Sequence, residues 1–334
     1  MKAVVLREHG EGELRYETDF PDPVPGAGDE VVRVRAASLN YHDIFTRRGM
    51  PGIKIPMPAI MGLDVAGEIA ATGPGVSGWK MGDRVLGDPI NRVEGGLTGE
   101  TVHGGLAEYC RLRAHQLVKI PDGVGFAEAA ALPCAYGTAR RMMFTHGRVT
   151  ASEKVLILGA SGGVGVCCVQ LAKLAGATVI AAAGWRKKPL ACGHSAPTIS
   201  STTRTRISST RSTRVTASRR GAGSDRGVDV VVNYTGGDTW TRSLRVLRVG
   251  GRLLTCGATA GYDPPEDIRF IWTFELKILG SNGWAREDVG ALLGMVQKGR
   301  LEAVIDATFP LERAPEALAR LEERRVFGKL VITP

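Results

Sequence analysis

The stretch KVLILGASGGVGVCCVQLAKLAGATVIAAA, residues 154–183, decides the fold. Its apolar run Val155–Leu158 has the length and composition of a buried parallel strand, and a helix-period segment follows the glycine cluster. A second apolar strand is expected over Thr178–Ala182, after Gly176. Strand, glycine turn, helix and strand make one βαβ unit. The sequence therefore predicts an α/β fold with a doubly wound parallel sheet.

Gly159, Gly162 and Gly165 give this unit the spacing of a dinucleotide-binding turn. Glycines at these places allow a tight turn, close approach of a pyrophosphate to backbone N–H groups and close helix–strand packing. The helix N-terminus adds a partial positive charge for the phosphates. Glycine turns also join strands to helices in many other folds, but the two flanking strands and the helix favour the dinucleotide site.

Length and composition favour a two-domain protein with ordinary hydrophobic cores. The chain has 334 residues, of which 43% are hydrophobic. No apolar run reaches the length of a membrane span, and the N-terminus resembles a strand and turn and not a signal peptide, so a cytoplasmic protein is expected. The six cysteines show no C-x-x-C spacing, which predicts reduced thiols with neither a disulfide framework nor a zinc knuckle.

The net charge of +9 comes from one segment. Residues 185–226 hold ten Lys or Arg and a single acidic residue, Asp225, whereas the rest of the chain carries 33 residues of each sign. A basic protein often binds nucleic acid, but here the basicity is local and nucleic acid is an improbable partner.

Residues 1–122 have the pattern of a mostly antiparallel β-domain, with turn residues between short apolar strands. The strands are expected over Lys2–Leu6, Glu30–Ala36, Val65–Ala71, Arg84–Leu86 and Leu106–Arg111. A helical stretch, Phe126–Phe144, follows, with Pro133 beginning or kinking a helix. Later strands are expected over Val228–Val232, Arg252–Cys256, Leu276–Leu279 and Lys329–Thr333, with an amphipathic helix over Ala314–Glu323.

Six ordered motifs closely resemble the medium-chain dehydrogenase/reductase superfamily, and within it the zinc-type alcohol dehydrogenase and quinone oxidoreductase branch. They are GDRV (82–85), HGGLAEY (103–109), ASGGVG (160–165), GVDVVV (227–232), GGRLLTCGAT (250–259) and FGKLVITP (327–334). The resemblance implies a GroES-like catalytic domain over 1–122, a Rossmann domain over 123–297 and a C-terminal segment, 298–334, that completes the catalytic domain. It also implies an NAD(P)H cleft between the domains and a homodimer formed through the Rossmann sheet edge near Leu276–Gly280.

The metal ligands of the zinc members do not recur in this chain. By motif, Asn40 stands where those members have a ligating Cys, Leu63 where they have His and Asp64 where they have Glu. Cys134 stands near the place of a third ligand, but a small core residue is the simpler interpretation. The four-cysteine lobe of the family is also missing, because residues 87–101 contain no Cys. No zinc is expected.

Without zinc, reduction of an already electrophilic acceptor is easier than oxidation of an alcohol, which needs a metal to lower the hydroxyl pKa. The favoured function is therefore NAD(P)H-dependent reduction of a quinone or an α,β-unsaturated or otherwise activated carbonyl compound. One alternative is an alcohol dehydrogenase with a degenerate metal site. Another is an inactive or binding-only relative, whose Arg-rich segment could bind nucleic acid nonspecifically.

The residues themselves, and for Thr138, Asn233, Gly257, Ala258 and Lys329 the resemblance, give candidates for both halves of the reaction. Asn40 and Tyr41 are expected to orient and polarise the acceptor carbonyl and His42 to relay a proton, while Asp43 fixes their loop. For Asn40 and His42, a loop or surface role is the alternative. The cofactor residues are expected to be Thr138, Gly159, Ser161, Gly162, Gly163, Val164, Gly165, Arg186, Lys187, Asn233, Gly257, Ala258 and Lys329.

Residues 185–225 break the pattern of the family. This Ser-, Thr- and Arg-rich stretch replaces a helix and a strand of the expected connection, and its codons, read in a displaced frame, can spell AEKAARLRALGADHLVNY, a family-like helix and strand. We therefore interpret it as the product of a frameshift. The strand before it ends without the acidic residue that binds the NAD ribose, and Arg186 and Lys187 could bind a 2′-phosphate, which favours NADP(H) over NAD(H).

Overall fold

The computed structural model describes residues 1–10, 14–49, 54–183 and 227–334. They form two compact units, residues 1–137 with 284–334 (unit 1) and residues 138–283 (unit 2). This division differs from the predicted one, because residues 123–137 and 284–297 belong to unit 1 and not to the Rossmann part. The helices at these places pack on unit 1 elements, α2 (Phe126–Ala130) on its sheet and α8 (Arg286–Gln297) on residues 132–137.

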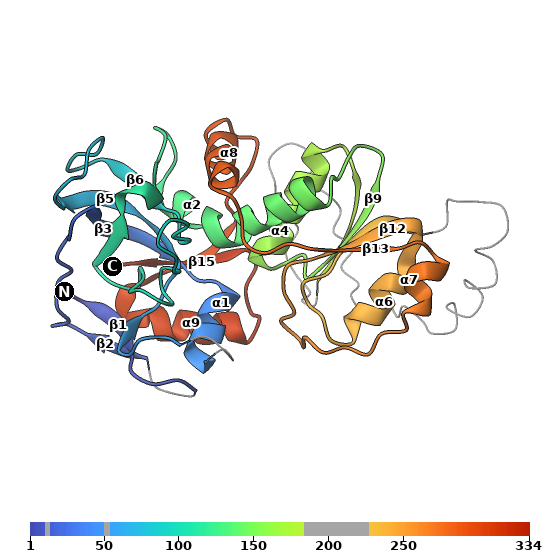
Figure 1. Ribbon diagram of the computed structural model, residues 1–334, viewed down its shortest axis with the longest axis horizontal. Helices are drawn as coiled ribbons and strands as arrows, with labels where there is room; N and C mark the ends of the chain where they lie inside the picture. Colours follow the sequence, from blue (N-terminus) through green and yellow to red (C-terminus); the bar gives the residue numbers. More distant parts are fainter. Residues whose placement is uncertain (11–13, 50–53, 184–226) are drawn as a thin grey trace. The chain divides into compact units, whose positions relative to one another are not determined.

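Unit 1 is mostly antiparallel, as predicted, and contains two sheets (Figure 1). The larger sheet has the order β14-β15-β3-β5-β6-β8, and β7 pairs with β3. Its strands are β3 (Asp29–Ser38), β5 (Asp64–Thr72), β6 (Arg84–Gly87), β7 (Tyr109–Arg113), β8 (Leu117–Lys119), β14 (Ile305–Pro310) and β15 (Lys329–Thr333). The smaller sheet has β1 (Ala3–Leu6) between β2 (Arg15–Glu17) and β4 (Ala59–Ile60).

Apolar residues that alternate along these strands fill one core with α1 (Tyr41–Arg48) and α9 (Ala314–Glu322) beside it. Two short 3₁₀ turns cover 114–116 and 311–313. The predicted strand Leu106–Arg111 begins later in the structure, at Tyr109, since Leu106 and Ala107 contact β1 instead. The predicted helix over Phe126–Phe144 is broken after α2 into a π-helical turn at Leu132–Gly137, where Pro133 lacks a backbone N–H.

Unit 2 is built on a parallel sheet of five described strands in the order β10-β9-β11-β12-β13. They are β9 (Lys154–Leu158), β10 (Thr178–Ala182), β11 (Val228–Val232), β12 (Leu247–Thr255) and β13 (Lys277–Gly280). The helices are α3 (Thr138–Arg140), a π-helical turn Arg141–His146, α4 (Gly163–Leu174), α6 (Thr239–Val246) and α7 (Arg269–Thr273). This confirms the predicted α/β class and the βαβ unit at residues 154–183.

Hydrophobicity explains why β9 and β11 occupy the middle of this sheet. Val155 and Val230 pair in parallel register and are fully buried, as are Val231 and Val232. Cys167 and Cys168 on α4 pack as small apolar residues, and burial raises the pKa of both thiols. Among the described residues no helix is long and apolar enough to cross a membrane. The segment 185–225, which we interpret as the product of a frameshift, lies outside the described residues.

Candidate functional site

A buried polar cluster lies where β3 ends and α1 begins. The register of β3 on β5 pairs Ser38 with Asp64, and the Ser38 hydroxyl lies 2.8 Å from Asp64 Oδ2. Asn40 Nδ2 donates to the same oxygen at 2.8 Å, while the backbone N–H of Cys134 donates to Oδ1 at 3.0 Å. The Asp64 side chain is fully buried, so both of its oxygens are held by protein donors.

Lys329, at the start of β15, supplies the positive charge of this cluster. Its Nζ donates to the Leu39 carbonyl at 2.8 Å and to Asn40 Oδ1 at 2.5 Å, and it lies 3.4 Å from Asp64 Oδ2. The side chain is 2% exposed. Lys329 was predicted among the cofactor residues, and in the structure its ammonium group lies inside unit 1, within 3.4 Å of three protein oxygens. A contact with the cofactor stays a prediction.

The same bonds determine what Asn40 can do. Its amide oxygen accepts from Lys329 and its amide nitrogen donates to Asp64, and the residue is 6% exposed. The side chain therefore has a fixed orientation. To polarise a substrate carbonyl, as predicted, it would have to exchange one of these bonds for a bond to the substrate.

The donor set at this place does not fit zinc. Leu63 is buried and has no donor atom, and Asp64 is neutralised by the Lys329 ammonium, which a metal cation would have to displace. Cys134 contributes its backbone N–H to the cluster. Across residues 1–10, 14–49, 54–183 and 227–334, no group of three or more His, Cys, Asp or Glu side chains is arranged to hold a metal ion.

His42 and Asp43, on the first turn of α1, are electrostatically linked. His42 Nε2 lies 2.6 Å from Glu100 Oε2. Burial alone would lower the pKa of His42, but the hydrogen bond to Glu100 and the charges of Asp43 and Glu100 raise it above its usual value. Burial raises the pKa of Asp43 to about 6, against the lowering effects of the Asn40 N–H and the His42 charge.

Asp43 holds the loop as predicted, through backbone amides. Its Oδ2 accepts from the Asn40 N–H at 2.7 Å and its Oδ1 from the Gly62 N–H at 3.1 Å. Tyr41 packs edge-on against Phe45, with ring centroids 5.3 Å apart. Tyr41 and His42 are both partly exposed, and each carries a hydrogen-bond donor. They can therefore donate to a substrate more directly than Asn40, the third predicted catalytic residue, which is buried.

The glycine turn in unit 2 has the geometry that a dinucleotide site requires. Gly159 adopts a φ of +66°, and a Cβ atom on Gly165 would lie 2.3 Å from the Gly159 carbonyl oxygen. Gly162 is the N-cap of α4, so the N–H groups of Gly163, Val164 and Gly165 form the open first turn. These donors and the helix dipole fit the pyrophosphate of a nicotinamide dinucleotide.

Other predicted cofactor residues lie at the same edge of the sheet. Gly159 follows β9, Asn233 follows β11, and Gly257 and Ala258 follow β12, so all four are at carboxyl ends of parallel strands. The Asn233 side chain is fully buried and bonds to Ser243 Oγ at 2.9 Å and to the Gly236 N–H at 3.0 Å. Its amide therefore stabilises the turn before α6, and a contact of Asn233 with the cofactor stays a prediction.

Of the remaining predicted cofactor residues, Ser161 lies in the glycine turn, and Thr138 begins α3 and is 8% exposed. Arg186 and Lys187 lie outside the described residues. Tyr234 was not predicted. Its hydroxyl donates to the Gly159 carbonyl at 2.5 Å, and burial raises its pKa well above the usual value. The pair Asn233-Tyr234, which directly follows the apolar run Val228–Val232, is the only sequence feature that could have indicated that Tyr234 supports the glycine turn.

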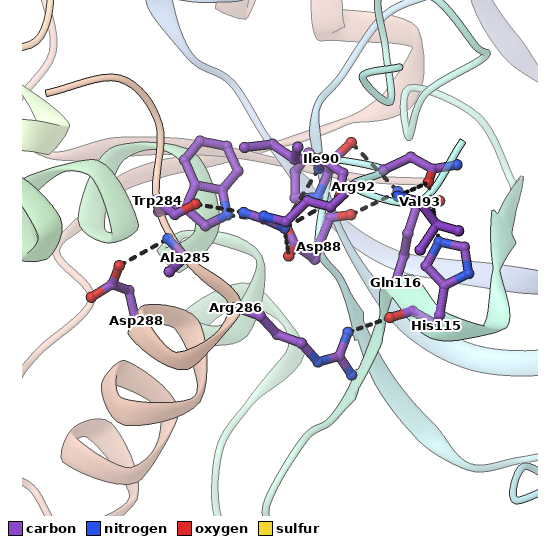
Figure 2. Close-up of polar contacts among 12 residues, drawn as sticks. Asp88, Ile90, Arg92, Val93, His115, Gln116, Trp284, Ala285, Arg286 and Asp288 are labelled. Carbon is purple, nitrogen blue, oxygen red and sulfur yellow. Dashed lines mark hydrogen bonds and ion pairs between the residues drawn. The ribbon is translucent and has the colours of Figure 1, made fainter. Parts of the chain in front are cut away.

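A second polar cluster in unit 1 anchors the cysteine-free lobe, residues 87–101. Asp88 is 1% exposed, and Figure 2 shows Arg92 and Trp284 converging on it. The indole N–H of Trp284 donates to Asp88 Oδ1 at 3.0 Å, while the Arg92 guanidinium pairs with Asp88 Oδ2 and donates to the Trp284 carbonyl. Gln116 Nε2 donates to the Asp88 carbonyl at 2.8 Å. These hydrogen bonds therefore connect the cysteine-free lobe to Trp284, the first residue of the second stretch of unit 1.

Replacing Asp88 by alanine is expected to lower the free energy of unfolding by about 3 kcal/mol, because it leaves a guanidinium and a buried indole N–H without their acceptor. Chemical denaturation of the purified variant measures this. The control is Glu316→Ala, which breaks the exposed Arg313–Glu316 pair and should cost less than about 1 kcal/mol. Equal effects of the two substitutions would show that the Asp88 network does not stabilise the lobe.

Comparisons with known proteins agree with this architecture. Residues 26–122 match the family model of the alcohol dehydrogenase GroES-like domain, and residues 204–332 match that of the zinc-binding dehydrogenases. The chain is 30% identical to the quinone oxidoreductase of Rattus norvegicus over 95% of this chain and 92% of the relative. It is 29% identical to the acryloyl-coenzyme A reductase of Sulfurisphaera tokodaii over the full length of both.

Among solved structures, an NAD-dependent alcohol dehydrogenase superposes with a TM-score of 0.86 at 33% identity, over the whole of both chains. The parallel sheet of unit 2 is thus a Rossmann domain, and the antiparallel part of unit 1 is a GroES-like domain. With both domain models and full-length relatives in agreement, the chain belongs to the medium-chain dehydrogenase/reductase superfamily.

Proposed function

We propose that the protein is an NADP(H)-dependent oxidoreductase that transfers hydride to a quinone or to an α,β-unsaturated carbonyl compound without catalytic zinc. The observation that carries this proposal is the Lys329–Asp64–Asn40 cluster, since an ammonium group and its acceptors fill the place where zinc members have metal ligands. Relatives named quinone oxidoreductase and acryloyl-coenzyme A reductase support an acceptor of this chemistry.

Each part of the site has a role in this reaction. The N–H groups of Gly163, Val164 and Gly165 bind the pyrophosphate of the cofactor, which supplies the hydride. Tyr41 and His42 donate hydrogen bonds to the acceptor oxygen, which gains negative charge during reduction. His42, whose pKa the hydrogen bond to Glu100 helps to raise, then provides the proton. Asn40, fixed by Lys329 and Asp64, positions the first turn of α1.

Titration of the purified protein with NADPH and NADH, followed by nicotinamide fluorescence and melting temperature, is the primary test. We expect tighter binding and greater stabilisation with NADPH, because β10 ends without an acidic residue and the basic residues Arg186 and Lys187 follow it. Turnover with quinones or enones, unaffected by chelators, should follow. Binding of neither cofactor would contradict the proposal, and stoichiometric zinc with chelator-sensitive alcohol oxidation would favour the alcohol dehydrogenase alternative.

The pH dependence of turnover tests the role of His42. Reduction should slow as the pH rises through the raised pKa of His42, because the cation that donates the proton is lost. Glu100→Gln removes the carboxylate that helps to raise this pKa, so the alkaline fall in kcat/KM should move to lower pH. Glu312→Gln, at an exposed site in the same unit, is the control and should leave the profile unchanged. An unmoved profile in Glu100→Gln would exclude this use of His42.

We also propose that the protein acts as a homodimer joined through β13. This strand is at the end of the described unit 2 sheet, and Ile278 on it is 37% exposed. Ile278→Glu should therefore produce monomers in sedimentation experiments. Ile268→Glu, at a more exposed position outside the strand, should not change the oligomeric state, and a dimeric Ile278→Glu variant would contradict this interface.

A further inference from the structure

Unit 1 contains a cavity of about 550 Å³ that includes none of the predicted catalytic or cofactor residues. It is bounded by the segment Phe20–Pro23, by β7 and by residues 91–103 of the cysteine-free lobe and the loop after it. Its volume is within the range of about 300–1,000 Å³ that small-molecule sites occupy. The cavity has both polar and apolar walls, so its unpaired groups indicate what it could bind.

The acidic groups on the cavity wall already have partners. Asp29 Oδ1 accepts from the Arg113 guanidinium at 2.9 Å, and Asp22 lies 2.7 Å from the amino group of Met1. The amide of Gln116 is also used, since it donates to the Asp88 carbonyl and accepts from the Arg113 N–H. A cationic ligand would therefore have to displace existing pairs.

The uncommitted groups on the wall are donors. Asn91 is not one of them, because its Oδ1 accepts from the Val93 and Glu94 N–H groups, both at 3.1 Å, and its side chain also bonds to the Glu94 carboxylate. The Ile60 N–H lies 3.3 Å from His103 Nδ1, so the ring proton is on Nε2. Burial and the charge of Arg111 lower the pKa of His103, which keeps the ring neutral at neutral pH.

Arg111 provides the least compensated charge on the cavity wall. Its Nε lies 3.7 Å from Asp29 Oδ2, a carboxylate that Arg113 contacts more closely, and its side chain is 55% exposed. The Thr98 hydroxyl on the wall is itself buried, so the groups left for a ligand are the Arg111 guanidinium and the His103 Nε2–H. A ligand with a negative charge and several acceptor atoms would satisfy these groups.

Apolar side chains complete the wall. Phe20 lies edge-on to His103 with ring centroids 5.5 Å apart, and Val102 is 49% exposed on the same wall. Such surfaces favour a ligand with a carbon skeleton over a bare inorganic anion. We propose that this cavity is a second ligand site that binds a small organic carboxylate, with Arg111 pairing its charge and Phe20 and Val102 contacting its apolar body.

Ligand-observed NMR with benzoate and hexanoate as probes tests this proposal on the full-length protein, with and without saturating NADPH. We expect saturable binding in both conditions. Arg111→Gln should weaken it about tenfold, the value of one charge-assisted hydrogen bond. Val102→Trp, which fills the cavity, should weaken it at least as much. The matched control is Arg300→Gln, which removes an exposed arginine of unit 1 that is not on the cavity wall. This variant should bind both probes as tightly as the native protein does.

Three results would overturn the proposal. The first is that neither probe shows saturable binding to the native protein. The second is that Arg111→Gln and Val102→Trp bind the probes as tightly as the native protein. The third is that benzamide or inorganic phosphate binds as tightly as benzoate, because a neutral isostere or a bare anion would then be enough. None of these readouts depends on turnover, so they are independent of the proposed oxidoreductase activity.

Discussion

Lys329→Met is expected to lower the free energy of unfolding by about 3–5 kcal/mol. The substitution removes the ammonium group that neutralises Asp64, whose side chain is fully buried. An unpaired buried carboxylate is costly, and breaking a buried ion pair by removing one partner typically costs this much. Asn40 Oδ1 and the Leu39 carbonyl would lose a donor as well. Denaturant midpoints and calorimetric melting of the purified variant measure the loss.

The double variant Asp64→Asn, Lys329→Met separates charge from packing. If the unpaired charge causes the loss, replacing Asp64 by the neutral asparagine should recover a large part of it. Lys298→Met, at an exposed position after α8, should change stability by less than about 0.5 kcal/mol. Native stability of Lys329→Met would refute the ion pair, and with it the main support for zinc-free chemistry.

Periodicity and glycine placement were enough to predict the class of the Rossmann part and its βαβ unit, but not the start of β12, which begins at Leu247 and not at Arg252. Strands β10 and β11 have the predicted bounds, Thr178–Ala182 and Val228–Val232, because short apolar runs that contain β-branched residues are typical of strands. The strand β15, Lys329–Thr333, was also predicted correctly. Short strands of unit 1 were harder. The strand β7 begins at Tyr109 and not at Leu106, since pairing with β3, far away in sequence, sets where it starts.

The domain boundaries depend on tertiary packing that local patterns do not contain. Helix α8 follows the last Rossmann strand, and its amphipathic pattern is equally compatible with either unit. The residues that assign it to unit 1 are Trp284, which lies against Gly137 and Asp88, and Arg286, which donates to the carbonyl groups of His115 and Leu117. Each of these contacts joins residues more than a hundred positions apart.

The candidate site shows the same limit. Motif matching identified Asn40, Asp64 and Lys329 separately, but only the strand register brings them together, because β15 and β5 both pair with β3. The sequence therefore suggested Lys329 as a cofactor residue but could not show that its ammonium group lies 3.4 Å from Asp64 Oδ2. Glu100, the partner of His42, lies in a lobe whose path has no periodic signal, so its role could not be anticipated.

Gly165→Ala is expected to weaken NADPH binding by about tenfold to a hundredfold. The new Cβ atom would lie 2.3 Å from the Gly159 carbonyl oxygen and 2.6 Å from the Tyr234 hydroxyl, so the first turn of α4 would have to move away from β9. Overpacking of this kind costs about 1–3 kcal/mol. The displaced N–H groups of Gly163 and Val164 would no longer converge on the pyrophosphate. Fluorescence titration with NADPH measures the effect.

The matched control is Gly290→Ala in α8, where an added Cβ atom meets nothing within 4 Å. This variant should be more stable by about 0.5–1 kcal/mol, because alanine is the better helix former, and should bind NADPH as the native protein does. The contrast assigns any loss in Gly165→Ala to its position and not to the change of residue type. If Gly165→Ala keeps native affinity, the turn between β9 and α4 is only a structural connection, and the cofactor must be held by other residues.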